Sequence, residues 1–182
     1  MKIFGNIGLF YTVGSSFIGL GPYKKRIEKA VQEGDKEAER QAIYDVSKFW
    51  TAKIIKFLNL EINVVNPENL PKEGPVVYVA NHQSYADVIP FLAVAKHQVG
   101  FIAKDSLERF PVFADWVLRI RSLFIKRGDA RTSLGTINEG ANMVKEGYSL
   151  VIFPEGTRNK GDALSLLPFK EGSFKIALKS GC

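Results

Sequence analysis

The stretch Val76–Asp87 has the sequence VVYVANHQSYAD. Its first five residues are apolar and mostly β-branched or aromatic, which is typical of a short buried strand. The next seven residues place an imidazole, His82, and a carboxylate, Asp87, at a short fixed separation directly after that strand. A strand that ends in a chemically active loop is therefore the first structural unit that the sequence predicts.

Short apolar segments alternate with helical patterns along the rest of the chain. We expect strands at Val76–Ala80, Phe101–Lys104, Leu123–Lys126 and Leu150–Phe153. We expect helices at Tyr85–Lys96, Leu107–Leu118 with an interruption near Pro111, Ala130–Lys145 and Glu171–Lys179. This alternation predicts an α/β fold in which a mixed, partly parallel sheet is flanked by helices. Ligands of such sheets gather at the carboxyl ends of strands, where two polar loops follow, Asn81–Asp87 and Phe153–Arg158.

His82 and Asp87 are candidates for general-base chemistry. If Ser84 is the N-cap of the following helix, Asp87 lies at its third position and reaches back toward the histidine. The carboxylate then accepts the imidazole N–H and leaves the other ring nitrogen to deprotonate a hydroxyl. A purely structural interpretation stays open, because Ser84-x-x-Asp87 also resembles a capping box. His97 lacks such a partner, so we expect it at the surface or at a helix C-cap.

Four cationic residues lie where predicted strands or loops end: Lys104, Arg127, Arg158 and Lys170. In a parallel sheet they would converge on one rim, and arginine binds phosphate with paired charge-assisted hydrogen bonds. Each cation taken singly also fits an ordinary surface charge. We expect Glu155 to orient Arg158 or to bond an acceptor hydroxyl, and Gly156 to let the backbone approach a ligand closely.

The composition indicates one globular domain: 182 residues, of which 46% are hydrophobic and 24% charged. A net charge of +6 and a pI of about 9.4 suit an anionic partner, such as a membrane surface, a phosphorylated substrate or nucleic acid. Cys182 is the only cysteine, which excludes an internal disulfide and a cysteine metal cluster and favours a reducing cytosolic setting. With two histidines and no ligand spacing for magnesium, we expect no metal site.

The N-terminal third carries a candidate membrane-docking element. Residues 3–23 contain no charge and are long enough to cross a bilayer, but their glycines and polar residues favour an interfacial or soluble helix. Lys24, Lys25 and Arg26 follow, and in any membrane arrangement they would stay on the cytoplasmic side. Residues 24–42 carry dense mixed charge and predict a solvated helix. The apolar stripe of residues 43–58 fits a core helix or, with Lys53 at a headgroup layer, a membrane-docking one.

Several other chemistries are not indicated. The chain has no G-x-S-x-G elbow for a serine acyl-enzyme, and neither a P-loop nor a G-x-G-x-x-G pattern for nucleotides. No aromatic–basic stacking pattern or reader motif indicates nucleic acid binding. A histidine base without a protein nucleophile implies direct attack by a substrate hydroxyl.

Four blocks of the sequence resemble, in order, those of the glycerolipid acyltransferases, and within that family the lysophosphatidic acid (1-acylglycerol-3-phosphate) acyltransferases. The blocks are Asn81-His82-x4-Asp87, Leu123–Arg127, Phe153–Arg158 and Leu167-Pro168-Phe169-Lys170-x-Gly172. They span about residues 76–175, which is over half of the chain. One block alone is modest support, whereas all four in order with compatible spacing are specific.

The resemblance implies roles for the candidate residues. His82 would be the general base, Asp87 its orienting partner, and Arg127 the ligand of the acceptor phosphate. Other implied acceptor-site residues are Lys104, Glu155, Gly156, Arg158 and Lys170. The implied reaction moves a fatty acyl group from acyl-CoA or acyl-carrier protein to the free hydroxyl of 1-acylglycerol 3-phosphate, which forms phosphatidic acid in phospholipid biosynthesis without a metal or redox cofactor. The implied partners are the lysophospholipid, the acyl donor and the cytoplasmic face of a membrane, to which attachment is peripheral or monotopic, and not nucleic acid.

Residues 1–66 are expected to form the N-terminal helical membrane-associating segment, and residues 67–182 the α/β acyltransferase domain. By the resemblance, related chains usually continue past the fourth block with at least one more strand, so we expect either that this domain is truncated at Cys182 or that its sheet closes differently. Two alternatives stay open. One is an acyltransferase that uses glycerol 3-phosphate or another lysophospholipid, and the other is a non-catalytic basic membrane-binding module.

Overall fold

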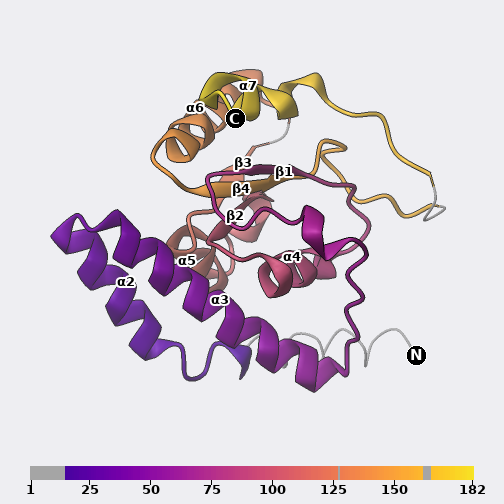
Figure 1. The fold of residues 1–182 in the computed structure, drawn as a ribbon. Coiled ribbons are helices and arrows are strands. Elements are labelled where there is room, and N and C mark those ends of the chain that lie inside the picture. The colour runs from indigo at the N-terminus through magenta and orange to yellow at the C-terminus, as the bar shows by residue number, and fades with distance from the viewer. Residues whose placement is uncertain (1–14, 127, 162–164) are drawn as a thin grey trace.

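A four-stranded parallel sheet forms the centre of the molecule (Figure 1). The computed structural model describes residues 15–126, 128–161 and 165–182. The strands are β1 (Val77–Val79), β2 (Val99–Lys104), β3 (Leu123–Ile125) and β4 (Ser149–Ile152), and they lie in the order β1-β4-β2-β3. All described pairings are parallel, so the carboxyl ends of the four strands share one edge of the sheet.

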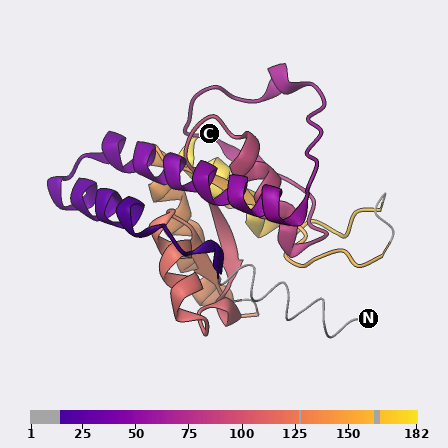
Figure 2. The same cartoon turned by 90° about the horizontal axis from the view of Figure 1, so that it is seen from below.

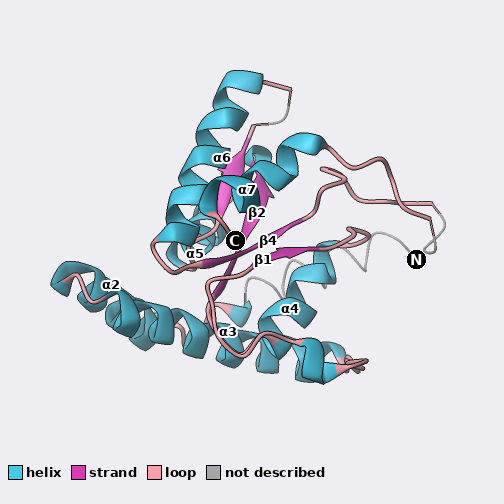
Figure 3. Cartoon of the chain, turned by 45° about the horizontal axis from the view of Figure 1, so that its top comes forward, coloured by secondary structure: helices cyan, strands magenta, loops and turns pink. Residues whose placement is uncertain are grey.

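Helices cover both faces of this sheet (Figure 3). The α-helices are α2 (Gly21–Glu33), α3 (Lys36–Leu58), α4 (Val88–Val94), α5 (Pro111–Arg119), α6 (Ala130–Lys145) and α7 (Lys175–Ser180). In the described ranges they are accompanied by the 3-10 turns η1 (Pro67–Asn69), η2 (Tyr85–Asp87), η3 (Asp105–Leu107) and η4 (Glu171–Phe174). α6 and α7 lie on one face, α3 and α4 on the other, and α2 packs beside α3 (Figure 2).

The predicted α/β fold with flanking helices is confirmed, and most differences concern the ends of elements. α6 has the predicted bounds, whereas the predicted helix Tyr85–Lys96 begins as the turn η2 and ends at Val94. Pro111 starts α5 instead of interrupting a helix, because a proline in the first helical turn has no N–H that the helix would need. The predicted helix Glu171–Lys179 consists of η4 followed by α7.

The prediction of one solvated helix over residues 24–42 is wrong. Gly34, with φ of 69°, ends α2, and Asp35 caps α3 by accepting a hydrogen bond from the N–H of Ala38 at 2.9 Å. Most of the charged side chains lie on the outer faces of the two helices, and Glu39 is the buried exception within this segment. Ile27 and Ala42 on the inner faces are buried in one core cluster, so this segment is a packed hairpin.

α3 changes character along its length. Ile43, Val46 and Ile54 are buried, whereas Phe57 near its end is 63% exposed. The first part is therefore a core helix, and the most exposed large apolar side chain of α3, Phe57, lies near the end of the helix. Within the described ranges, no helix is both long and apolar enough to cross a membrane. Most of the predicted segment 3–23 lies outside the described residues.

Side chains along a strand point alternately to the two faces of the sheet, and in β4 they pack against helices on both faces. In β4, Leu150 and Ile152 pack with Ile176 of α7 and with α6 on one face. Val151 lies between them in sequence and packs on the opposite face with α4, where Trp50 of α3 also contributes. This period of two is the pattern expected of a strand that is buried on both faces.

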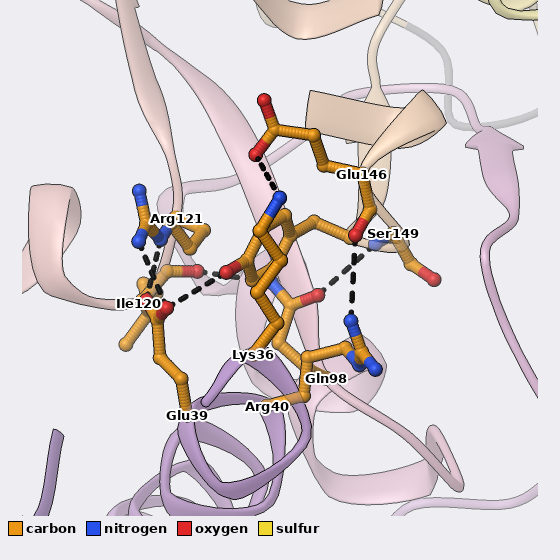
Figure 4. A network of polar contacts seen from close by, with 9 residues as sticks. Lys36, Glu39, Arg40, Gln98, Ile120, Arg121, Glu146 and Ser149 are labelled. Atoms are coloured by element: carbon orange, nitrogen blue, oxygen red, sulfur yellow. Dashed lines mark hydrogen bonds and ion pairs between the residues drawn. The ribbon is translucent and has the colours of Figure 1, made fainter. Parts of the chain in front are cut away.

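A buried carboxylate ties α3 to the edge of the sheet where the strands begin (Figure 4). Glu39 is 3% exposed, accepts hydrogen bonds from Arg121 on both of its oxygens, and accepts another from the Tyr148 hydroxyl at 2.7 Å. Arg121 precedes β3 and Tyr148 precedes β4. The helical hairpin is therefore fixed at the edge opposite to the two polar loops.

We predict that Tyr148 makes the free energy of unfolding fall as the pH rises from about 10 to about 12. Burial and the hydrogen bond to Glu39 raise the pKa of Tyr148 from 10.0 to about 12. Because the folded phenol keeps its proton where the unfolded one loses it, this stabilisation is complete below pH 10 and is lost above it. Urea denaturation of the unmodified chain and of Tyr148→Phe across this range tests the prediction. The variant should lack this part of the decline, and identical pH profiles would contradict the assignment.

Candidate active site

The two predicted polar loops lie side by side at one edge of the sheet. β1 and β4 are adjacent, with Val79 opposite Ile152. The N–H of Ala80 donates to the carbonyl of Ile152 at 3.1 Å, and the N–H of Asn159 donates to the carbonyl of His82 at 2.7 Å. The loop after β1 is thus hydrogen-bonded to the loop after β4.

The imidazole of His82 contacts the carboxylate of Asp87. The distance from Nδ1 to Oδ2 is 2.8 Å, and the two side chains are 14% and 24% exposed. The same Oδ2 accepts the backbone N–H groups of Gln83 at 2.8 Å and of Ser84 at 2.9 Å. Three donors therefore converge on one oxygen, which holds the carboxylate toward the histidine.

The catalytic and the structural interpretations of Asp87 are compatible. The Ser84 side chain accepts the N–H of Asp87 and the Asp87 side chain accepts the N–H of Ser84, which together make the capping box that opens η2. The Ser84 hydroxyl also accepts the N–H of Ala86 at 3.1 Å. The cap orients the carboxylate, and its oxygen serves the imidazole as well.

Phe153 and Glu155 hold His82 from the neighbouring loop. The ring of Phe153 stacks on the imidazole, with a centroid separation of 4.2 Å and an angle of 18° between the planes. Oε1 of Glu155 accepts the backbone N–H of His82 at 2.7 Å. One contact restrains the ring and the other restrains the backbone, so the side chain has little freedom to turn.

This arrangement leaves Nε2 of His82 available to a ligand. Asp87 accepts only, so the hydrogen-bond network assigns the imidazole proton to Nδ1 and the lone pair to Nε2. Among the described residues, Nε2 has no hydrogen-bond partner. A neutral imidazole held in this way is able to remove a proton from a hydroxyl.

Two of the predicted cations lie close to these loops. Lys170 donates its backbone N–H to the carbonyl of Pro154 at 2.8 Å, and its side chain crosses Gly156. Gly156 has φ of 63°, which strains any other residue, and a Cβ there would lie 2.9 Å from Nζ of Lys170 and would displace the end of that side chain. The guanidinium of Arg158 lies 3.7 Å from the ring centroid of Tyr85, in the turn that carries Asp87.

The other two predicted cations are less closely placed. Lys104 ends β2, which pairs with β4, so it lies at the same edge of the sheet. No hydrogen bond or ion pair joins its side chain to the other described candidates. Arg127 lies outside the described residues. The structure thus brings His82, Asp87 and Glu155 into contact, together with two local pairs: Gly156 with Lys170, and Arg158 with Tyr85.

The prediction for His97 is wrong. It is partly buried, and its Nε2 lies 3.3 Å from the hydroxyl of Tyr78 while the two rings stack. Lys48 of α3 donates to the carbonyls of Ala93 and Ala95 at the end of α4, which is the role expected of a C-cap. Burial lowers the pKa of His97 below the usual value of a histidine. Burial also raises the pKa of Tyr78 above the usual value of a tyrosine.

Sequence reasoning missed the contacts that Phe153, Tyr85 and Asn159 make with the site. All three lie within or beside the predicted blocks, so a signal was present. The contacts depend on β1 lying next to β4, however, and these strands are far apart in the chain. In the described part of the chain, no three histidine, cysteine, aspartate or glutamate side chains are grouped to hold a metal ion.

Comparison with known proteins identifies relatives of this fold and sequence. A family model described as Acyltransferase matches residues 61–182. The chain is 35% identical over 138 residues to the chloroplastic 1-acyl-sn-glycerol-3-phosphate acyltransferase LPAT1 of Arabidopsis thaliana, which covers 75% of the chain and 37% of that protein. It is also 35% identical over 103 residues to the lyso-ornithine lipid O-acyltransferase of Brucella abortus, which covers 57% of the chain and 37% of that protein.

A solved structure has the same overall fold. The crystal structure of the 1-acyl-sn-glycerophosphate (LPA) acyltransferase PlsC from Thermotoga maritima superposes with a TM-score of 0.74 at 26% identity. The match covers 100% of this chain and 72% of that one. The chain therefore spans well under half the length of the two curated relatives above and most of the length of the solved structure.

We predict that Asp87→Ala removes the low-field proton resonance of His82 Nδ1–H and lowers the free energy of unfolding by about 1–2 kcal/mol, because both the imidazole contact and the cap are lost. Ser84→Ala is the matched control. It weakens the cap but leaves the carboxylate beside the imidazole, so the resonance should persist. Proton NMR and urea denaturation measure the two effects. A resonance that survives in Asp87→Ala would contradict the assigned contact.

Proposed function

The chain belongs to the acyltransferase family, and on that premise we propose that it transfers a fatty acyl group to the free hydroxyl of 1-acylglycerol 3-phosphate, which forms phosphatidic acid. The observation that carries the proposal is the His82–Asp87 contact at the carboxyl ends of parallel strands, with Nε2 lacking a partner among the described residues. We propose acyl-CoA or acyl-carrier protein as the donor.

In the proposed mechanism His82 acts as the general base. Nε2 takes the proton of the acceptor hydroxyl while the hydroxyl oxygen attacks the carbonyl carbon of the acyl thioester. The carbon–sulfur bond breaks when the tetrahedral intermediate collapses, and the imidazolium returns the proton to the departing thiolate. Asp87 stabilises the imidazolium meanwhile, since its carboxylate already accepts the Nδ1 proton. These steps use no metal or redox cofactor.

The basic residues around the loops are the proposed site for the acceptor phosphate. The side chain of Lys170 crosses Gly156, the guanidinium of Arg158 lies over the ring of Tyr85, and Lys104 lies at the same edge of the sheet. Arg127 is proposed from the family resemblance alone. A guanidinium and ammonium groups bind a phosphate through charge-assisted hydrogen bonds, and this supports a phosphorylated acceptor.

A different acceptor is the second candidate function. The similarity to a protein named for lyso-ornithine lipid supports it, because that name describes a lysolipid with another headgroup. Glycerol 3-phosphate also fits a basic site that recognises a phosphate. Both alternatives keep the same base and the same thioester chemistry and differ only in what the basic residues recognise.

We also propose that the protein works as a peripheral or monotopic protein at the cytoplasmic face of a membrane. Phe57, Leu58 and Leu60 at the end of α3 are exposed, and Lys53 and Lys56 precede them. The end of α3 lies on the side of the molecule toward which the loops after β4 project (Figures 1 and 3). Such a surface suits insertion of apolar side chains between anionic headgroups, next to the source of a lipid acceptor.

We predict that His82→Ala lowers the turnover number by about 10²–10⁴-fold, which is the usual contribution of a general base, while the thermal unfolding midpoint changes little. Labelled acyl-CoA and acyl-carrier protein are tested against 1-acylglycerol 3-phosphate, glycerol 3-phosphate and other lysolipids in vesicles. His97→Gln, at the opposite edge of the sheet, is the control and should retain turnover.

Three results would count against the proposal. Normal turnover in His82→Ala would exclude the general base. Preference for another acceptor would favour the second candidate function. Vesicle binding without acyl transfer to any acceptor would indicate a non-catalytic membrane-binding module.

A further inference from the structure

Glu155 has an unusual position for a residue expected to contact a substrate. It is 2% exposed, although it lies between solvent-accessible loops. Its Oε1 accepts the N–H of His82 at 2.7 Å, and its Oε2 accepts the N–H of Leu167 at 3.1 Å. Each oxygen of the buried carboxylate therefore bonds a backbone donor from a different loop.

The two donors show what this carboxylate joins. His82 lies in the loop after β1, Glu155 in the loop after β4, and Leu167 opens the segment that leads to Lys170. A buried carboxylate without hydrogen bonds would be strongly unfavourable, so both bonds have to form when the loops pack. Glu155 thereby couples the position of the imidazole to the position of the segment that carries a proposed phosphate ligand.

We infer that Glu155 is a positioning residue that clamps the backbone of His82 to the segment 167–170 and does not bind the acceptor. This inference rests on the proposed acyl transfer, since the group that it positions is the proposed base. The side chain of His82 is restrained by Asp87 and Phe153, and among the described residues its backbone is hydrogen-bonded to Asn159 and Glu155. Without the clamp, the backbone of His82 keeps the bond from Asn159 but loses its tie to Glu155 and to the segment that begins at Leu167.

Steady-state kinetics separates a clamp from a ligand. Glu155→Gln keeps the size of the side chain but has one carbonyl oxygen for two N–H donors, so one loop must come loose. A clamp predicts that kcat falls about 100-fold through misplacement of the base, while KM for the acceptor stays within about twofold. A ligand of the acceptor predicts a raised KM instead. Glu73→Gln, an exposed glutamate in the loop before β1, is the matched control and should change neither constant.

Amide hydrogen exchange tests the clamp without relying on catalysis. In the unmodified chain, the amides of His82 and Leu167 should exchange at least about 100-fold more slowly than in an unstructured peptide. In Glu155→Gln, at least one of these two amides should lose about tenfold or more of its protection, and in Glu73→Gln both should keep it. Thermal unfolding of each variant shows whether the fold survives.

The outcomes are distinct for the inference and for the proposed function. If the unmodified chain transfers no acyl group to any acceptor, the proposed function is overturned. The amide exchange rates of His82 and Leu167 still show in that case whether Glu155 holds the two loops together. A raised KM with unchanged kcat in Glu155→Gln would overturn the inference, and so would unprotected amides of His82 and Leu167 in the unmodified chain. That last measurement needs no variant, so it holds even if Glu155→Gln does not fold.

Discussion

One oxygen of Asp87 organises the candidate site. It accepts the imidazole N–H of His82 and two backbone N–H groups from the same loop, so the turn that caps η2 is also the turn that aims the carboxylate. A helix cap and a base–carboxylate pair are usually treated as alternative explanations of an aspartate. Here a single loop geometry satisfies both, and the stability of the turn becomes a condition for the orientation of the imidazole.

The parallel sheet supplies the second constraint. Because β1 and β4 are neighbours, the loop that carries His82 lies against the loop that carries Phe153 and Glu155. At the opposite edge, Glu39 fixes the α2–α3 hairpin to the beginnings of β3 and β4. The edge of the sheet that carries the proposed catalytic loops is therefore separate from the edge at which the helical hairpin is attached. The polar loops are free to serve a ligand because the anchoring of the hairpin is done elsewhere.

The sequence predicted the parts of this structure that local spacing determines. The alternation of strands and helices, the bounds of α6 and the approach of Asp87 to His82 all depend on residues within one or two turns of each other. The order of the strands does not, so the contacts across the two loops were missed. The residue type of Glu155 also did not indicate whether its carboxylate faces a ligand or the backbone. The turn at Gly34 was missed because charged residues continue on both sides of it and were interpreted as one helix.

The most direct measurement is a crystal structure of the chain with 1-acylglycerol 3-phosphate bound and no acyl donor. The free hydroxyl should lie within hydrogen-bond reach of Nε2 of His82, about 2.6–3.2 Å, with the phosphate among the basic residues that include Arg158 and Lys170, and Glu155 should remain buried against the backbone. A lipid bound elsewhere, or a hydroxyl that contacts Glu155 and is remote from Nε2, would contradict the proposed roles of these residues.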